Sequence, residues 1–436
     1  MASDIAGLPH WEVGFDEQGR AGQGEVEALL GELPGKGLSD LFVFSHGWNN
    51  DRRQARRLYQ RFFEQVPGLL AQGGGHAAKV GTLGVVWPSK RWADEPEPTG
   101  DADGGAAGLG DAGPASDSAL VEDLNDVFPG DDRGQALDEL ARLLEERPAD
   151  PAALARFQTL MGELAGEPDA EAAAEDQGEQ ALLEDDPEEV FGRFADAVPQ
   201  PGEGGAAGLG DAFGRLWNGA KEALRQLTYF EMKKRAGVVG KQGLGPLLGR
   251  LHQADPDLRV HLLGHSFGAR LVSFALAGLP GEAGSPVKSL YLLQGAFSHF
   301  AFADALPMDR SRGGALKGMA ARVDGPLVAS FSTHDTAVGK LYPLASLSSR
   351  DDAAGLEDRL FRWGGIGHDG AQAVDATVAA LAPVGSSYPF QRGRFVNLDG
   401  NAIVNRGGPP SGAHSDIFHP ELVWAGLAAA GLVAAT

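Results

Sequence analysis

The chain has 436 residues, which is more than one compact core usually needs, so we expect a main domain that carries an insertion or a second lobe. The absence of cysteine excludes disulfides, thiolate catalysis and cysteine-ligated metal sites. The formal net charge of −23 at pH 7 argues against nucleic-acid binding, because that function requires clustered Lys and Arg.

Neither end of the sequence has the pattern of a targeting or anchoring segment. Residues 1–17 contain no basic start followed by an apolar run, so we expect no signal peptide. No run of about 18 apolar residues occurs, and the longest candidate, Leu422 to Thr436, is shorter, so we expect no membrane span. We therefore expect a cytoplasmic protein.

Strands and helices alternate in the first part of the chain. Leu41 to Phe44 is a short apolar run that predicts a buried strand, and apolar residues at helical spacing predict a helix from about Asp51 to Leu70. One of residues 49–51 is expected to cap this helix. Residues 79–87 predict a second buried strand, which ends before Pro88.

The middle of the chain differs in charge from the rest. Residues 94–203 contain 31 acidic and 5 basic side chains, whereas the remainder is close to neutral. We expect a core of residues 1–92 and 229–436, with an acidic, Ala/Gly-rich helical insertion over residues 93–228. The insertion is a candidate lid over an active site or a binding surface for a protein partner.

The insertion is expected to be partly helical and partly disordered. Helices are predicted at 135–146 and 152–164, and disorder is predicted near 96–117 and 166–188. The sequence GGAAGLGDA occurs twice, at 104–112 and 204–212. The two copies are either flexible hinges or simple sequence drift in a chain rich in alanine and glycine.

Alternation of helices and strands resumes after the insertion. Helices are predicted at 240–253, 267–279 and 420–433, and strands at 258–263, 287–293, 327–332 and 394–398. Strands that are separated by helices indicate a parallel sheet covered on both faces. The predicted fold class is therefore α/β, with a mostly parallel sheet, helices on both faces and the acidic helical insertion.

The sequence GHSFG at residues 264–268 directly follows a predicted strand and opens a predicted helix. The pattern Gly-x-Ser-x-Gly arises easily by chance in a chain with 63 glycines, but this context is that of a tight turn which raises a serine hydroxyl above a sheet. The glycines leave room for the strained turn, and the helix N-terminus favours developing negative charge. Ser266 is therefore the candidate nucleophile, and an ordinary glycine-rich turn is the alternative.

A second motif, HGWNN at residues 46–50, joins the first predicted strand to a helix. In esterases a His-Gly loop at this point donates a backbone N–H to the oxyanion. We expect the oxyanion donors to be the N–H groups of Trp48 and Phe267, with Gly47 as the alternative to Trp48. The His46 side chain is expected to have a structural role.

HGWNN after one strand and GHSFG much later in the chain resemble the α/β-hydrolase superfamily. They are most similar to bacterial families of uncharacterised serine hydrolases that carry HG-aromatic-Asn-Asn. The resemblance covers residues 38–92 and 229–430 but not the acidic insertion. It implies an α/β-hydrolase sheet and a serine nucleophile, and it leaves the substrate open.

This fold orders its catalytic residues along the chain as Ser, then Asp or Glu, then His. The base should follow the last strand, where His414 is favoured over His419 because His419 lies beside the predicted start of the final helix. The acid should follow an earlier strand, which favours Asp335 over Asp369 and Asp416. The alternative role for Asp335 is to cap the turn that follows it.

A set of Ser266, Asp335 and His414 predicts hydrolysis of a carboxylic ester through an acyl-enzyme intermediate. Aromatic residues near strand ends are candidates for an apolar acyl pocket that takes a small-molecule or lipid-like ester; they are Trp48, Trp87, Phe297 and Phe300. Thioesterases and serine peptidases use the same residues, and a non-catalytic interaction protein on a hydrolase scaffold is the alternative from another class. Neither an HExxH helix nor a Walker loop occurs, so we expect no metal and no cofactor.

Overall fold

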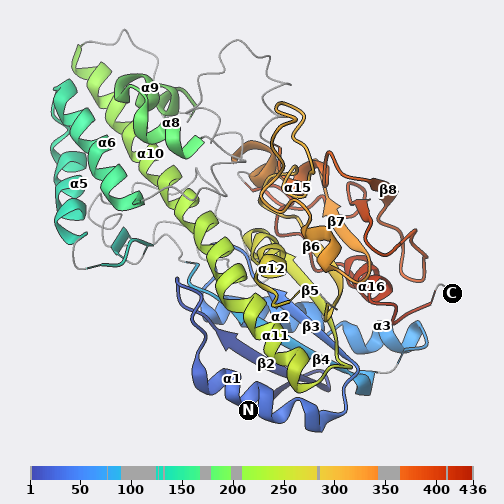
Figure 1. The fold of residues 1–436 in the computed structure, drawn as a ribbon. Coiled ribbons are helices and arrows are strands. Elements are labelled where there is room, and N and C mark those ends of the chain that lie inside the picture. The colour runs from blue at the N-terminus through green and yellow to red at the C-terminus, as the bar shows by residue number, and fades with distance from the viewer. Residues whose placement is uncertain are drawn as a thin grey trace.

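The computed structural model describes residues 2–75, 77–89, 124–125, 127–130, 133–166, 178–197, 209–281, 285–341, 364–408 and 411–434. Within these residues, nine strands form one sheet in the order β1-β2-β4-β3-β5-β6-β7-β9-β8 (Figure 1). Neighbouring strands are parallel except for β1 and β2. With helices on both faces, this sheet confirms the predicted α/β fold class. Its arrangement is compatible with an α/β-hydrolase fold.

The strands are β1 (Ser3–Ile5), β2 (Leu8–Gly14), β3 (Asp40–Ser45), β4 (Val80–Val86), β5 (Arg259–His265), β6 (Val287–Leu293), β7 (Leu327–Phe331), β8 (Ala376–Ala380) and β9 (Phe395–Asp399). All six predicted strands are present. The sequence did not predict β1, β2 and β8, which lie toward the two edges of the sheet. Pro9 interrupts the pattern of β2, and β8 is too exposed to show an apolar face.

Helices cover both faces of the central strands, and this explains why the strands have few polar positions. On one face, Val43 and Leu262 belong to a core that includes α1 (Gln23–Glu32), α11 (Gly245–Ala254) and α12 (Phe267–Gly278). On the other face, Phe44 and Leu263 pack with α2 (Arg52–Phe63), α3 (Val66–Gln72) and α16 (Pro420–Ala429). Neighbouring residues of one strand therefore serve different cores.

The segment after β3 is two helices, α2 and α3, so the prediction of one helix from Asp51 to Leu70 is wrong at residues 64–65. Asp51 caps α2, because its carboxylate accepts a hydrogen bond of 2.6 Å from the Gln54 N–H. In return, the side-chain oxygen of Gln54 accepts a hydrogen bond of 2.8 Å from the Asp51 N–H. Pro67 lies in the first turn of α3. A proline has no N–H and its ring collides with the carbonyl four residues earlier, so the first helix ends before it.

The chain between β4 and β5 contains α5 (Gly134–Glu146), α6 (Pro151–Ala165), α8 (Gly178–Glu184), α9 (Pro187–Ala197) and α10 (Leu209–Val238). The first two match the predicted helices. The expected disorder at 166–188 is wrong for residues 178–188, where Leu182 is fully buried and α9 begins. The expected disorder at 96–117 and the first GGAAGLGDA copy lie outside the described residues. The second copy runs into the start of α10.

Helix α10 joins the helices of the insertion to the layer that covers the sheet (Figure 1). Near its start, Trp217 packs edge-on against Phe157 of α6, with ring centroids 5.5 Å apart, and near its end it packs against α12. The expected boundary between residues 228 and 229 thus lies inside one continuous helix. Neither α10 nor another described helix is long and apolar enough to cross a membrane.

The contact between α9 and α10 depends on Gly219, because a Cβ at this position would stand 1.8 Å from the Phe191 carbonyl oxygen. We predict that Gly219→Ala lowers the free energy of unfolding by about 1–3 kcal/mol, measured by thermal or denaturant unfolding. Gly214→Ala is the matched control in the same helix, since no atom lies within 4 Å of its added Cβ. That variant should gain up to about 1 kcal/mol, because alanine is the better helix former. Equal stability of the two variants would contradict the close packing.

Candidate active site

The segments that carry the predicted catalytic residues follow four strands of the sheet. The HGWNN loop follows β3, Ser266 follows β5, Asp335 follows β7 and the loop of His414 follows β9. These strands are parallel, so their carboxyl ends lie on one edge of the sheet. The four segments therefore meet on one rim.

Ser266 occupies a sharp turn between β5 and α12, with φ 57° and ψ −125°. A non-glycine residue rarely adopts a positive φ, and such strain is characteristic of a nucleophile turn. Backbone hydrogen bonds hold the turn: the Ser266 N–H donates to the Leu293 carbonyl at 3.1 Å, and the Ser266 carbonyl accepts from the Ala296 N–H at 3.2 Å. The backbone of Ser266 is thus fixed by the loop after β6 as well as by its own helix.

Three glycines allow the backbone to close around this turn. A Cβ at Gly264 would stand 2.4 Å from the Gly268 carbonyl oxygen, and one at Gly268 would stand 2.0 Å from the Ser45 carbonyl oxygen. A Cβ at Gly47 would stand 2.6 Å from the Cβ of Ser266. Only glycine fits at these positions, so both glycines of GHSFG and the glycine of HGWNN are explained by close approach.

His414 and Asp335 form a buried hydrogen bond of 2.7 Å between Nδ1 and Oδ2. The other carboxylate oxygen of Asp335 accepts from the Val338 N–H at 3.0 Å, so the aspartate also caps the turn that follows it. Backbone bonds join the two loops, since the Ala413 N–H donates to the His334 carbonyl at 2.9 Å. Asp335 thus contacts both the imidazole of His414 and the turn that follows it, and its role as a catalytic acid stays a prediction.

The rival acids Asp416 and Asp369 are paired with His419 and His299 rather than with His414. His419 lies 2.7 Å from Asp416, and His299 lies 3.0 Å from Asp369. The structure thus separates three His–Asp pairs along this part of the chain. Among them, His414 belongs to the loop that contacts the residue preceding Ser266.

That contact is made by His265, the second residue of GHSFG. Its Nε2 lies 2.9 Å from the His414 carbonyl oxygen, and the two imidazole rings are 5.0 Å apart. Because a carbonyl only accepts, His265 must carry its proton on Nε2. Among the described side chains no hydrogen bond joins the Ser266 hydroxyl to His414, and in enzymes without substrate this bond is often long.

The HGWNN loop holds the carbonyl of Gly47 from one side. His46 Nδ1 lies 2.9 Å from this oxygen, and the Asn50 amide donates to it at 3.2 Å and to the Trp48 carbonyl at 2.9 Å. The Ser89 hydroxyl lies 3.1 Å from the Gly47 carbonyl oxygen and 3.0 Å from the Asn50 carbonyl oxygen, and it has one proton to donate to these two acceptors. In a trans peptide the C=O and N–H point in opposite directions, so the Trp48 N–H points away from these donors.

The His46 ring has a single tautomer, set by its neighbours. The Trp87 N–H donates to Nε2 at 3.3 Å, so the proton lies on Nδ1 and reaches the Gly47 carbonyl. The ring is also stacked on Trp87, with centroids 5.6 Å apart. Burial lowers the pKa of His46 to about 4, which keeps the ring neutral at pH 7. These contacts agree with a structural role for His46.

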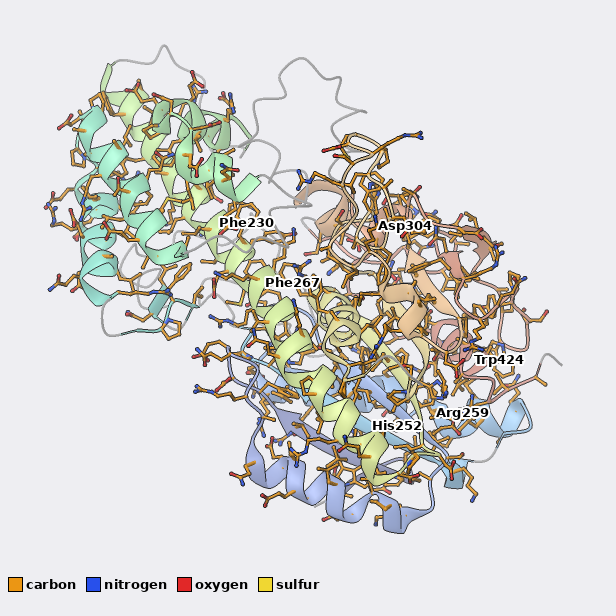
Figure 2. All side chains as sticks on the ribbon, in the orientation of Figure 1. Phe230, His252, Arg259, Phe267, Asp304 and Trp424 are labelled. Carbon is orange, nitrogen blue, oxygen red and sulfur yellow. The ribbon has the colours of Figure 1, made fainter. Side chains whose placement is uncertain are left out.

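The two expected oxyanion donors lie together beneath an aromatic residue of α10. The rings of Trp48 and Phe267 are 6.0 Å apart, and Tyr229 lies 5.1 Å from Phe267 and 6.0 Å from Trp48. Neither the Trp48 N–H nor the Phe267 N–H has a hydrogen-bond partner among the described residues. The contact occurs where α10 passes the start of α12, near the labelled Phe230 and Phe267 (Figure 2). Sequence reasoning missed Tyr229, although it stands at the expected edge of the insertion.

The other expected pocket residues lie in different environments. Trp87 lies behind the HGWNN loop, where its indole N–H donates to the His46 carbonyl at 3.0 Å. Phe300 belongs to a small cluster with Ala303 and Leu306. Phe297 is fully buried, and its carbonyl accepts from the Ile366 N–H. Trp87 and Phe297 belong to the same apolar core as Trp48, whereas Phe300 lies in a separate cluster, and their place in an acyl pocket stays a prediction.

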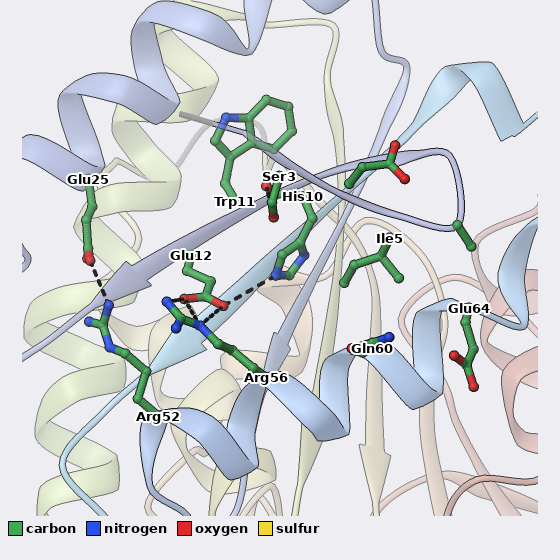
Figure 3. Close-up of a pocket in the computed structure, with 12 residues that line it drawn as sticks. Ser3, Ile5, His10, Trp11, Glu12, Glu25, Arg52, Arg56, Gln60 and Glu64 are labelled. Carbon is green, nitrogen blue, oxygen red and sulfur yellow. Dashed lines mark hydrogen bonds and ion pairs between the residues drawn. The ribbon is translucent and has the colours of Figure 1, made fainter.

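A polar groove of about 570 Å³ lies elsewhere, between α2 and the strands β1 and β2 (Figure 3). Its charged side chains are largely paired: Arg56 lies 2.8 Å from Glu12, and Arg52 lies 3.1 Å from Glu25. The groove shares none of its lining residues with the rim of Ser266. Pairing within the protein leaves these charges little capacity to bind a ligand.

A hydrogen-bonded set of Ser289, His261 and Asp40 lies near the amino ends of the strands. His261 Nδ1 lies 2.9 Å from the Ser289 hydroxyl, and His261 Nε2 lies 2.9 Å from Asp40. All three residues are buried, and Ser289 lies within β6 rather than at a helix start. This set therefore has the residue types of a triad without a turn that presents the serine.

Buried neutral histidines should make the protein sensitive to acid. Burial lowers the pKa of His265 to about 3 and that of His46 to about 4, below the unfolded value of about 6.5. Their contribution is therefore complete above pH about 6.5 and is lost as the pH falls toward the folded pKa, because only the unfolded chain takes up these protons. Each can lower the free energy of unfolding by up to about 1.4 kcal/mol per pH unit in this window.

We expect denaturant unfolding between pH 7 and pH 5 to show this loss and to show a shallower slope for His265→Gln. His334→Gln, at an exposed position of the same rim, controls for the removal of an imidazole as such. Equal slopes for the wild type and His265→Gln would contradict the neutral state of His265.

The geometry described above is the main guide to function. No protein-family model, no curated protein and no solved structure matches the chain. The resemblance to α/β-hydrolases thus rests on the two motifs and on a compatible sheet.

Proposed function

We propose that the protein is a serine hydrolase that cleaves a carboxylic ester through an acyl-enzyme intermediate on Ser266. The observation that carries the proposal is the buried hydrogen bond between Asp335 and His414 on the rim where Ser266 adopts its strained turn. With Nδ1 bound to Asp335, Nε2 is the atom of His414 that is left to accept the serine proton.

In the first half of the reaction, the Ser266 oxygen attacks the ester carbonyl while its proton passes to His414 Nε2. Collapse of the tetrahedral intermediate breaks the bond to the alcohol, which leaves with the proton from His414. In the second half, water attacks the acyl-serine and gives its proton to His414, and the acid is released with restoration of the Ser266 hydroxyl. Asp335 keeps the imidazole oriented and stabilises its charged form.

The developing oxyanion is assigned to the N–H groups of Trp48 and Phe267. The Phe267 N–H is at the first residue of α12, where backbone donors have no partner within the helix. The Trp48 N–H is oriented by the bonds that hold the Gly47 carbonyl. Donors that are fixed before the reaction need no reorganisation when the charge develops, and each is typically worth several kcal/mol.

A fluorophosphonate probe tests the nucleophile, because it reacts with an activated serine. We expect labelling of the wild type and none of Ser266→Ala. Ser289→Ala is the matched control, since Ser289 also lies beside a His–Asp pair, and its labelling should equal that of the wild type. Absence of labelling in the wild-type protein would favour a non-catalytic interaction protein on the same scaffold.

Asp335→Asn should lower kcat for a p-nitrophenyl ester by about 10⁴-fold, because the amide does not hold the required imidazole tautomer. A panel of p-nitrophenyl esters of increasing acyl length measures this rate and identifies the preferred chain. Thioester and amide analogues of the best ester then distinguish an esterase from a thioesterase or a peptidase. A kcat that Asp335→Asn leaves unchanged would contradict the assignment of the acid.

Asn50→Ala removes two hydrogen bonds from the HGWNN loop and should lower kcat by about tenfold or more, with KM little changed. The reason is that the Trp48 N–H loses its fixed orientation, which matters in the transition state. Asn405→Ala is the control, since this exposed asparagine also donates to two backbone carbonyls, at 3.1 and 3.3 Å, in the loop after β9. Equal kcat values for the two variants would argue against Trp48 as an oxyanion donor.

A further inference from the structure

Gln226 is a buried polar side chain that makes no hydrogen bond. It lies on α10 and is 1% exposed. Neither its Oε1 nor its Nε2 has a partner among the described residues. Burial of an unpaired amide is unfavourable, and most buried polar groups in native proteins are paired, so this residue requires an explanation.

The glycines of α10 show what packs on the face that carries Gln226. Positions 7 and 11 residues away lie on the same face, because each residue turns the helix by about 100°. Gly219 packs against α9, whereas Gly237 packs against α12. Gln226 therefore lies between the part of this face that α9 covers and the part that α12 covers.

The nearest part of α12 is its N-terminus, which directly follows Ser266. Tyr229, one turn along α10 from Gln226, contacts Phe267, while Gly237 lies farther along and packs against Arg270 and Phe274. The two helices thus advance in the same direction. Gln226 therefore lies one turn before Tyr229, the residue of α10 that contacts both Trp48 and Phe267.

The Trp217 side of α10 faces the other helices of the insertion and does not include Gln226. Trp217 packs against Phe157 of α6, and the nine residues between positions 217 and 226 place Gln226 on the opposite side of the helix. The face of α10 that carries Gln226 is therefore the one opposite α6, on which α9 packs at Gly219.

We propose that Gln226 recognises a hydrogen-bonding group in the acyl part of the substrate. A glutamine amide presents a donor and an acceptor side by side, and a secondary amide matches both. The substrate class is then an ester whose acyl chain carries a carboxamide, as in an N-acylated amino acid. An alkyl chain of the same length leaves both atoms of Gln226 unpaired, and sites of this kind discriminate strongly against such analogues. This inference rests on the proposed function of Ser266 and deepens it.

Two p-nitrophenyl esters test the inference, the N-acetylglycinate and the pentanoate, whose acyl chains have equal length. The measured quantity is the ratio of their kcat/KM values, compared between the wild type and Gln226→Met, so that the intrinsic reactivity of each ester cancels. We expect Gln226→Met to lower the preference for the amide-bearing ester by about tenfold or more.

Gln158→Met is the matched control. Gln158 is a buried glutamine of α6 whose amide donates to the Leu182 and Asp185 carbonyls at 3.0 and 2.8 Å. Its substitution should lower the melting temperature and leave the ratio unchanged. Gln226→Met should not lower the melting temperature, because it removes a polar group that had no partner.

The outcomes separate the two proposals. If the wild type hydrolyses both esters and Gln226→Met leaves the ratio unchanged, the role of Gln226 is overturned while the proposed function stands. If Gln226→Met lowers both the ratio and the melting temperature, the change in the ratio reflects a damaged fold, and this also overturns the role of Gln226. If the wild type hydrolyses neither ester and the probe does not label Ser266, the proposed function is overturned and this inference with it.

Discussion

The site depends on a close approach of backbone to backbone around one strained residue. Ser266 keeps its positive φ because β5, α12 and the loop after β6 hold it, and because three glycines let the neighbouring segments close in. Strain of this kind persists only where the surroundings over-determine it. The positions of the HGWNN loop and of the loop that carries His414 follow from the same packing, since both contact this turn or the residue before it.

The sequence predicted the central strands and one hydrogen-bonded pair of the candidate site, but it did not predict the edge strands. Short apolar runs ended by glycine or proline predicted the central strands, because strands that are buried on both faces tolerate few polar residues. The chain order of Ser266, Asp335 and His414 predicted a pair that is present, the buried bond between Asp335 and His414. Their assignment as catalytic residues stays a prediction. The edge strands could not be predicted, because β8 is largely exposed and Pro9 interrupts β2.

The rest of the site could not be read from the sequence because it depends on contacts between distant segments. Tyr229 lies at the edge of an acidic region whose composition suggested a lid or a binding surface for a partner, and its contact with Trp48 depends on how α10 packs against the core. Ser89 reaches the Gly47 carbonyl across 42 residues. Trp87 stacks on His46 and Phe300 packs in a separate cluster, and the predicted part of both residues in an acyl pocket stays a prediction.

Ser289, His261 and Asp40 have the residue types and hydrogen-bond distances of a catalytic triad. Residue types and distances therefore do not by themselves define a catalytic site. The two hydrogen bonds of this set, both of 2.9 Å, are only slightly longer than the 2.7 Å bond between Asp335 and His414 on the rim. What it lacks is a turn that lifts the serine out of the sheet and a helix start beneath it. Cross-strand pairing is sufficient to bring such residues together inside a parallel sheet, and there they satisfy one another as buried polar groups.

Helix α10 has one further consequence for the molecule. Its 30 residues correspond to a rod of about 45 Å, anchored at one end among the helices of the insertion and at the other beside the sheet. No proline interrupts the helix between these two contacts, so nothing in its sequence favours a kink. A change in the tilt of α10 among the insertion helices would therefore also move the part of α10 that lies beside the sheet. The insertion and the contact of Tyr229 with Trp48 and Phe267 are therefore joined by one continuous helix.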